Sequence, residues 1–143
     1  MKAEIRYQSR GGNTLAVAQE ISKILNIPQA PIEEKLPDMV DLLFIGGGVY
    51  MFDIDKNMKK FLDSLSYEKV KAVAIFTTSG HINGTGKMAD YLKDKGIDVL
   101  DSLSFKAGVR NYHLFGGQGT LKLTQDDKGI IQVFVDKVVG KVG

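Results

Sequence analysis

Two apolar runs constrain the fold of this chain more than any other feature of its sequence. Asp41–Gly46 contains four consecutive apolar residues, and Val70–Phe76 is apolar except for Lys71. Short runs without polar alternation are typical of strands that are buried on both faces, as in parallel sheets. We therefore expect a central parallel sheet with helices covering both of its faces.

Helical patterns alternate with the strand patterns along the chain. This alternation predicts a protein of α/β class with a doubly wound parallel sheet, right-handed crossovers and a three-layer αβα arrangement. Residues 33–39 hold a proline and few apolar residues, so at most one helical turn is expected there. In chain order, we expect strands at Ala3–Tyr7, Ile27–Ile32, Asp41–Gly46, Val70–Phe76 and Ile97–Phe105. The first helix should end at Leu25, and the second should cover 54–65. The third should run from a cap at Thr85 to Lys95, and the last should begin at Thr124 or Asp126.

Residue types at the helix ends refine these limits. Asn26 and Gly96 suit the left-handed positions that end helices, and Asp53 or Asp55 can cap the helix at 54–65. Residues 107–123 are rich in glycine and are expected to form a long loop or a small hairpin. Helical spacing predicts that the last helix packs on the sheet through Ile130, Ile131, Phe134, Val138 and Val139.

The segment 9–14, which joins the first strand to the first helix, has the composition of an anion-binding loop. It reads Ser-Arg-Gly-Gly-Asn-Thr. Its glycines permit a tight turn and close approach of a ligand, and Asn13 or Thr14 can cap the helix. Free N–H groups and the helix dipole favour an anion at such a helix start. Because the loop lacks both the Walker A lysine and the dinucleotide spacing, a terminal phosphate monoester fits best; the alternative is an ordinary capped turn.

This loop resembles the FMN phosphate loop of flavodoxins, whose usual pattern is Ser/Thr-x-Thr-Gly-Asn-Thr. Ser9, Gly12, Asn13 and Thr14 match the pattern, whereas Gly11 replaces a threonine. Arg10 occupies the variable position and could contact the phosphate or point into water. The resemblance implies one flavodoxin-like domain over residues 1–143, with five parallel strands in the order 2-1-3-4-5. It also implies FMN at the switch point between strands one and three.

The same resemblance implies roles for the loops that follow strands three and four. Tyr50, or in second place Phe52, would stack on the flavin ring, although either could simply cover the end of the sheet. Residues 77–80 would offer N–H groups and hydroxyls to the polar edge of the ring, or form only a cap and turn. The predicted FMN-binding residues are Ser9, Arg10, Gly11, Gly12, Asn13, Thr14, Gly47, Gly48, Val49, Tyr50, Met51, Thr77, Thr78, Ser79 and Gly80; no catalytic residue and no metal ligand is predicted.

Composition excludes several classes of function. The chain has no cysteine, which rules out a disulfide framework, a thiolate metal site and a cysteine nucleophile. Its formal net charge of +2 is too small to indicate a nucleic acid partner. It has neither an apolar run of roughly 20 residues nor a signal-peptide pattern, so we expect a cytoplasmic protein without a membrane span.

Three functions are compatible with these features. The first is an FMN-binding electron-transfer protein that serves redox partner proteins or small-molecule electron donors and acceptors. The second is a flavin-dependent oxidoreductase acting with quinone or NAD(P)H, because 45–50 and the basic helix after it also resemble flavodoxin-domain proteins related to menaquinone-dependent protoporphyrinogen oxidases. The third is a binding module that has lost flavin, which only Gly11 supports. The sequence favours a carrier over a substrate-specific enzyme and leaves that choice open.

Overall fold

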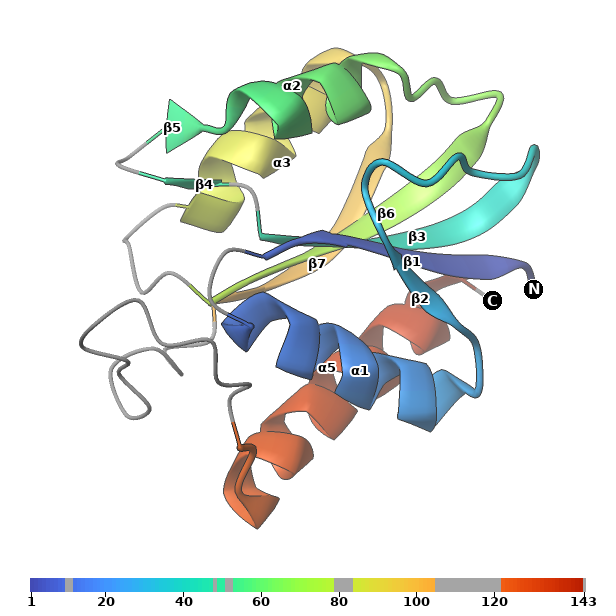
Figure 1. Cartoon of the computed structure of the whole chain (residues 1–143). Helices are drawn as coiled ribbons and strands as arrows, with labels where there is room; N and C mark the ends of the chain where they lie inside the picture. Colours follow the sequence, from blue (N-terminus) through green and yellow to red (C-terminus); the bar gives the residue numbers. More distant parts are fainter. Residues whose placement is uncertain (10–11, 48, 51–52, 79–83, 105–121, 143) are drawn as a thin grey trace.

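A five-stranded parallel sheet forms the centre of the computed structural model, which describes residues 1–9, 12–47, 49–50, 53–78, 84–104 and 122–142. The strands pair in the order β2-β1-β3-β6-β7 (Figure 1). Counted within this sheet, the order is 2-1-3-4-5, so the predicted fold class is confirmed. The strands are β1 (Ala3–Gln8), β2 (Gln29–Pro31), β3 (Val40–Gly47), β6 (Val70–Thr77) and β7 (Asp98–Ser104).

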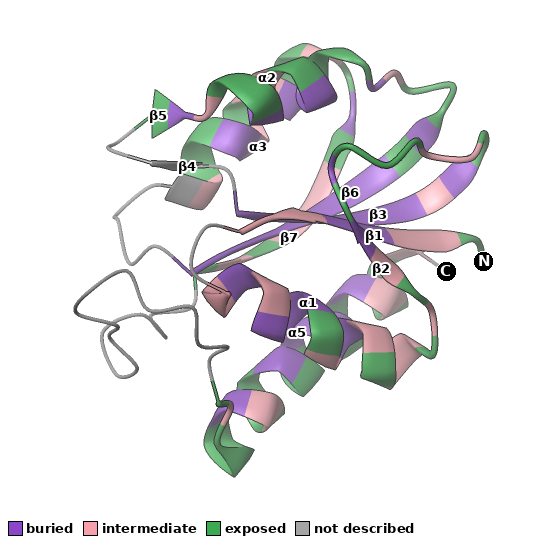
Figure 2. Cartoon of the chain, in the orientation of Figure 1, coloured by how far each residue is buried: buried purple, intermediate pink, exposed green. Residues whose placement is uncertain are grey.

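Helices cover both faces of the sheet. Helices α1 (Asn13–Leu25) and α5 (Gln125–Val142) lie on one face, and α2 (Lys56–Asp63) and α3 (Gly84–Asp94) lie on the other (Figure 1). Alternate residues of the central strands pack into two hydrophobic cores, one on each face of the sheet. Figure 2 shows β3 and β6 buried along most of their length. Phe44, for example, packs edge-on against Phe134 of α5, with ring centroids 6.0 Å apart. Within the described part of the chain, no helix has the length and apolar character needed to cross a membrane.

Most predicted helix ends are confirmed. Asn26 and Gly96 adopt positive φ values of 56° and 79° just after α1 and α3. Asp55 caps α2, because its side chain accepts a hydrogen bond from the Asn57 N–H at 2.9 Å. At the start of α5, the Asp127 N–H donates to Thr124 Oγ1 at 3.1 Å and the Thr124 N–H donates to Asp127 Oδ2 at 2.8 Å.

One prediction about α3 and one about α5 are wrong. Thr85 is not the cap of α3, because the helix already begins at Gly84. Ile130 does not face the sheet: it is 48% exposed, whereas Ile131, Phe134 and Val138 are buried as predicted. Val135 is buried as well, so the buried stripe runs through positions i, i+3, i+4 and i+7 from Ile131 and leaves Ile130 at its edge.

A buried arginine holds the connection between β2 and β3, where only a turn forms, as predicted. The side chain of Arg6 is 4% exposed. Its guanidinium donates to the carbonyls of Glu34 at 3.1 Å and Lys35 at 3.0 Å, and to Glu4 Oε1 at 3.1 Å. These bonds satisfy main-chain carbonyls that no helix satisfies in this segment. No local pattern marks this role, because arginine in a strand usually faces water.

Candidate functional site

The carboxyl ends of β1, β3 and β6 meet at one edge of the sheet. Gln8, the last residue of β1, pairs in register with Gly47 at the end of β3, and Gly46 pairs with Phe76 of β6. Strand β1 pairs with β3 and, on its other side, with β2, whereas β3 pairs on its other side with β6. The order therefore reverses between β1 and β3, which is where doubly wound sheets bind ligands.

Two glycines allow this edge to be tightly packed. A Cβ at Gly46 would lie 2.2 Å from the Phe76 ring. A Cβ at Gly47 would lie 2.0 Å from the Gln8 carbonyl oxygen, and Gly47 has a φ of +80°. Any larger residue at position 47 would push the ends of β1 and β3 apart. The spacing between the first two candidate loops thus depends on a direct main-chain contact.

Gly12, and neither Asn13 nor Thr14, is the N-cap of α1, which corrects the capping prediction. Gly12 has a φ of 85°, and no side chain caps the helix. Asn13 and Thr14 lie one and two positions beyond the cap, inside the first turn. The Gly12 N–H donates to Ser9 Oγ at 3.1 Å, which closes the turn before the helix.

The start of α1 is electrostatically suited to an anion. Ala16 makes the first helical hydrogen bond, to the Gly12 carbonyl at 3.0 Å. The N–H groups of residues 13–15 consequently have no acceptor within the helix. The first turn contains no acidic residue, so the positive end of the helix dipole is not neutralised by a carboxylate there.

A buried hydrogen bond joins this helix start to the end of β6. Thr14 Oγ1 and Thr78 Oγ1 lie 2.9 Å apart, and both threonines are buried. Each hydroxyl carries one hydrogen, and their mutual bond uses only one of the two. The pair therefore retains one O–H for another acceptor while connecting the first and third candidate loops.

Several buried polar atoms at this edge have no partner among the described residues. They are Asn13 Oδ1, Thr77 Oγ1 and Gln8 Oε1. Thr77 is only 1% exposed. A buried polar atom without a hydrogen bond costs stability, and most native structures avoid it. Unpaired atoms gathered at a switch point fit a ligand that supplies the missing donors and acceptors.

The segment after β3 is a short hairpin, which corrects the expectation of a glycine-rich loop. Strands β4 (Val49–Tyr50) and β5 (Asp53–Ile54) pair antiparallel, with Tyr50 opposite Asp53. Ile54 is buried in the core beneath α2 and α3 and anchors the hairpin. The N–H of Ile54 and the ammonium of Lys59, 3.6 Å away, hold the pKa of Asp53 below its ordinary value.

The structure brings many of the predicted residues together. Ser9, Gly12, Asn13, Thr14, Gly47, Thr77 and Thr78 lie at the carboxyl edge, as does the backbone of Val49 and Tyr50. Arg10, Gly11, Gly48, Met51, Phe52, Ser79, Gly80 and the segment 107–121 lie outside the described residues. Sequence reasoning missed Gln8, because nothing in the local pattern marks the last residue of a strand as part of a site.

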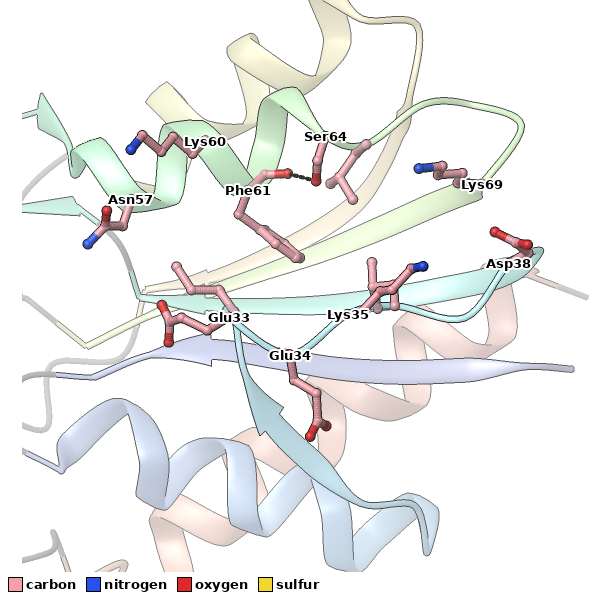
Figure 3. A pocket seen from close by; sticks show the side chains of 12 residues that line it. Glu33, Glu34, Lys35, Asp38, Asn57, Lys60, Phe61, Ser64 and Lys69 are labelled. Carbon is pink, nitrogen blue, oxygen red and sulfur yellow. Dashed lines mark hydrogen bonds between the residues drawn. The ribbon is translucent and has the colours of Figure 1, made fainter.

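A groove of about 480 Å³ lies elsewhere, between α2 and the connection from β2 to β3. Asn57, Lys60 and Phe61 form one wall and 33–35 form the other (Figure 3). Its rim carries charges of both signs. None of the predicted FMN-binding residues lines this groove, so the carboxyl edge of the sheet is the candidate site.

Sheet order and loop position together define a doubly wound α/β protein whose loops converge at a switch point. The family model described as "Flavodoxin domain" matches residues 4–136. The chain therefore belongs to the flavodoxin domain family.

One curated relative is similar to this chain in sequence, and two solved structures are similar to it in fold. The chain is 34% identical over 138 residues to the uncharacterised protein MJ0298 of Methanocaldococcus jannaschii, covering 89% of this chain and 91% of that protein. A flavodoxin from the domain Archaea superposes with a TM-score of 0.71 at 19% identity, over 99% of both chains. A flavoprotein of Lactobacillus acidophilus in complex with FMN superposes with a TM-score of 0.57 at 18% identity, over 78% of this chain and 97% of that one.

Proposed function

We propose that this protein binds FMN at the carboxyl edge of β1, β3 and β6 and works as an electron carrier. The observation that carries the proposal is the start of α1. A glycine cap, free N–H groups and the absence of acidic side chains in the first turn favour a phosphate group there. Family membership and the FMN complex of the Lactobacillus flavoprotein support FMN as the ligand.

The phosphate would be held by the segment 9–14. Ser9 Oγ already accepts a hydrogen bond from the Gly12 N–H, so its own hydrogen is available to a phosphate oxygen. The O–H left over from the Thr14–Thr78 pair is a second donor. In this proposal Arg10 and the main chain of Gly11 complete the cradle, with a charge-assisted contact from the guanidinium.

The ring would lie between the hairpin and the loop that begins at Thr77. Residues 47–51 would cover one face of the ring, with Tyr50 stacking on it. Thr77 Oγ1 is buried and unpaired among the described residues, so it can bond the polar edge of the ring together with Thr78, Ser79 and Gly80. FMN supplies the redox chemistry once bound, and the chain supplies binding, orientation and exclusion of water.

Titration of apoprotein with FMN tests the proposal. Flavin fluorescence should be quenched with a micromolar or tighter dissociation constant. Asn13→Asp places a carboxylate at the start of α1 with almost no change in shape. It should weaken FMN binding about tenfold or more by repelling the phosphate.

Gln125→Glu is the matched control, because it makes the same amide-to-acid change at the start of α5. It should leave FMN affinity unchanged. An apoprotein that leaves FMN fluorescence unaltered would contradict the proposal. So would an Asn13→Asp variant that binds FMN as tightly as the wild type, since the phosphate would then lie elsewhere.

The carrier role has its own test. Similarity to an archaeal flavodoxin over the full length of both chains supports a carrier. The FMN complex should accept electrons from a separate reductase and show no steady-state turnover with NAD(P)H or quinone alone. Rapid turnover with either small molecule would instead identify a flavin-dependent oxidoreductase.

A further inference from the structure

Gln8 contacts both of the segments that would hold the two ends of FMN. It ends β1 and directly precedes Ser9. Its side-chain Nε2 donates to Asp55 Oδ2 at 2.8 Å. Asp55 follows the β4–β5 hairpin and caps α2. This hydrogen bond therefore connects the phosphate segment to the base of the hairpin across 47 positions of sequence.

The partner of the Gln8 amide determines which way that amide points. Asp55 Oδ2 also accepts the Asn57 N–H at 2.9 Å, so it is an acceptor in both contacts. A reversed amide would place Gln8 Oε1 against the carboxylate and lose the bond. Gln8 is thus held with its nitrogen on Asp55, and its buried Oε1 has no partner among the residues that the structure describes.

The main chain of Gln8 contributes a second contact with the same region. A Cβ at Gly47 would come within 2.0 Å of the Gln8 carbonyl oxygen, so the two strand ends already touch. The backbone of Gln8 contacts Gly47, which ends β3 before the hairpin. The side chain of Gln8 bonds Asp55, which follows the hairpin. Both contacts therefore bear on the distance between the phosphate segment and the hairpin.

We infer that Gln8 is a positioning residue that sets the spacing between the Ser9–Thr14 segment and the hairpin, and so selects a ligand that carries both a phosphate ester and a flat ring. The inference rests on the proposed function. A ligand that uses only one segment does not depend on their spacing. A ligand that spans both gains from having that spacing preorganised.

The variant Gln8→Leu tests this selectivity by removing the hydrogen bond while retaining the bulk of the side chain. Dissociation constants are measured for FMN, riboflavin and inorganic phosphate. FMN affinity should fall about tenfold, while the affinities for riboflavin and phosphate change by less than about twofold. A merely structural role would lower all three together.

A second variant approaches the contact from its other partner. Asp55→Ser keeps a capping hydroxyl for α2 but is too short to reach Gln8. It should reproduce the FMN-selective loss, and the double variant should lose little more than either single variant. Gln132→Leu is the matched control, since it removes another amide-to-aspartate bond, of 2.9 Å to Asp136 on α5, and should leave FMN affinity unchanged.

The outcomes separate the two claims. Wild-type protein that fails to bind FMN defeats both the proposed function and the role of Gln8. Wild-type binding with an unaltered Gln8→Leu variant defeats only the positioning role, as does an equal loss for riboflavin or phosphate. If thermal melting shows that Gln8→Leu does not fold, Asp55→Ser decides the question with the same three ligands.

Discussion

Arg6 and Gln8 lie two positions apart on β1 and therefore on the same face of the sheet, yet their surroundings differ. The buried guanidinium of Arg6 donates to two carbonyls of the β2–β3 connection and to a carboxylate. Gln8 has one bonded nitrogen and one buried oxygen that meets no partner within the described part of the chain. The comparison shows that the polar side chain in the middle of the strand has hydrogen-bond partners that stabilise the fold. The one at the carboxyl end keeps an unused acceptor among the described residues, which a ligand could bond.

Removal of Arg6 is expected to produce the largest effect. Arg6→Met leaves the carbonyls of Glu34 and Lys35 without donors, so the free energy of unfolding should fall by about 3 kcal/mol. FMN affinity of the folded variant should stay within about twofold of wild type, because the contact lies away from the carboxyl edge. Urea denaturation and FMN titration measure the two quantities. A selective loss of FMN binding in Arg6→Met would show that Arg6, like Gln8, belongs to the ligand site.

Gly47→Ala should have the next largest effect. The added Cβ would meet the Gln8 carbonyl oxygen at 2.0 Å, in a backbone with a φ of +80°. We expect a loss of about 2 kcal/mol or more in unfolding free energy, together with weaker FMN binding. Gly96→Ala is the control, since Gly96 has a φ of +79° and open space around its Cβ position. Equal losses for the two variants would show that strain in φ, and not contact between the strands, explains the effect.

Thr77→Val should separate stability from binding. Thr77 Oγ1 has no partner in the described ranges of the chain, so its loss should change the unfolding free energy by less than about 0.5 kcal/mol or stabilise the protein. FMN affinity should nevertheless fall about fivefold. Thr124→Val removes a capping hydroxyl instead, and should cost about 1 kcal/mol of stability with no change in FMN affinity. If Thr77→Val loses stability as Thr124→Val does, Thr77 belongs with Arg6 as a structural residue.

The smallest expected effect concerns pH and the hairpin. The pKa of Asp53 lies below 3.8 because its carboxylate accepts the Ile54 N–H and lies near Lys59. Its contribution to stability is therefore present near neutral pH and is lost as the pH falls below the ordinary aspartate value. The melting temperature of wild type should exceed that of Asp53→Asn slightly at about pH 7, and the difference should shrink progressively as the pH falls below the ordinary aspartate pKa. A difference that grows on acidification would contradict the assigned cause. Added salt should also reduce it, because the pair is exposed.

Local patterns predicted the elements and their order with few errors. Continuous apolar runs identified β3 and β6, and the shortage of apolar residues after β2 correctly excluded a helix. The errors arose where two local choices were almost equivalent. Gly12 caps α1 in place of Asn13 because glycine readily adopts the left-handed conformation found at this position. Ile130 faces outward because a shift of one residue turns a helix by about 100°.

Sequence by itself determined most of the elements and the composition of the segment 9–14, because spacing and residue type act over a few neighbouring positions. The strand order was predicted only through the resemblance of that segment to flavodoxins. Tertiary structure alone decided that Arg6 supports a connection 28 positions away, that Gln8 bonds Asp55 at a separation of 47, and that Thr14 meets Thr78 at a separation of 64. Such contacts depend on which strand ends become neighbours, and no local pattern encodes a distance between segments so far apart in the chain.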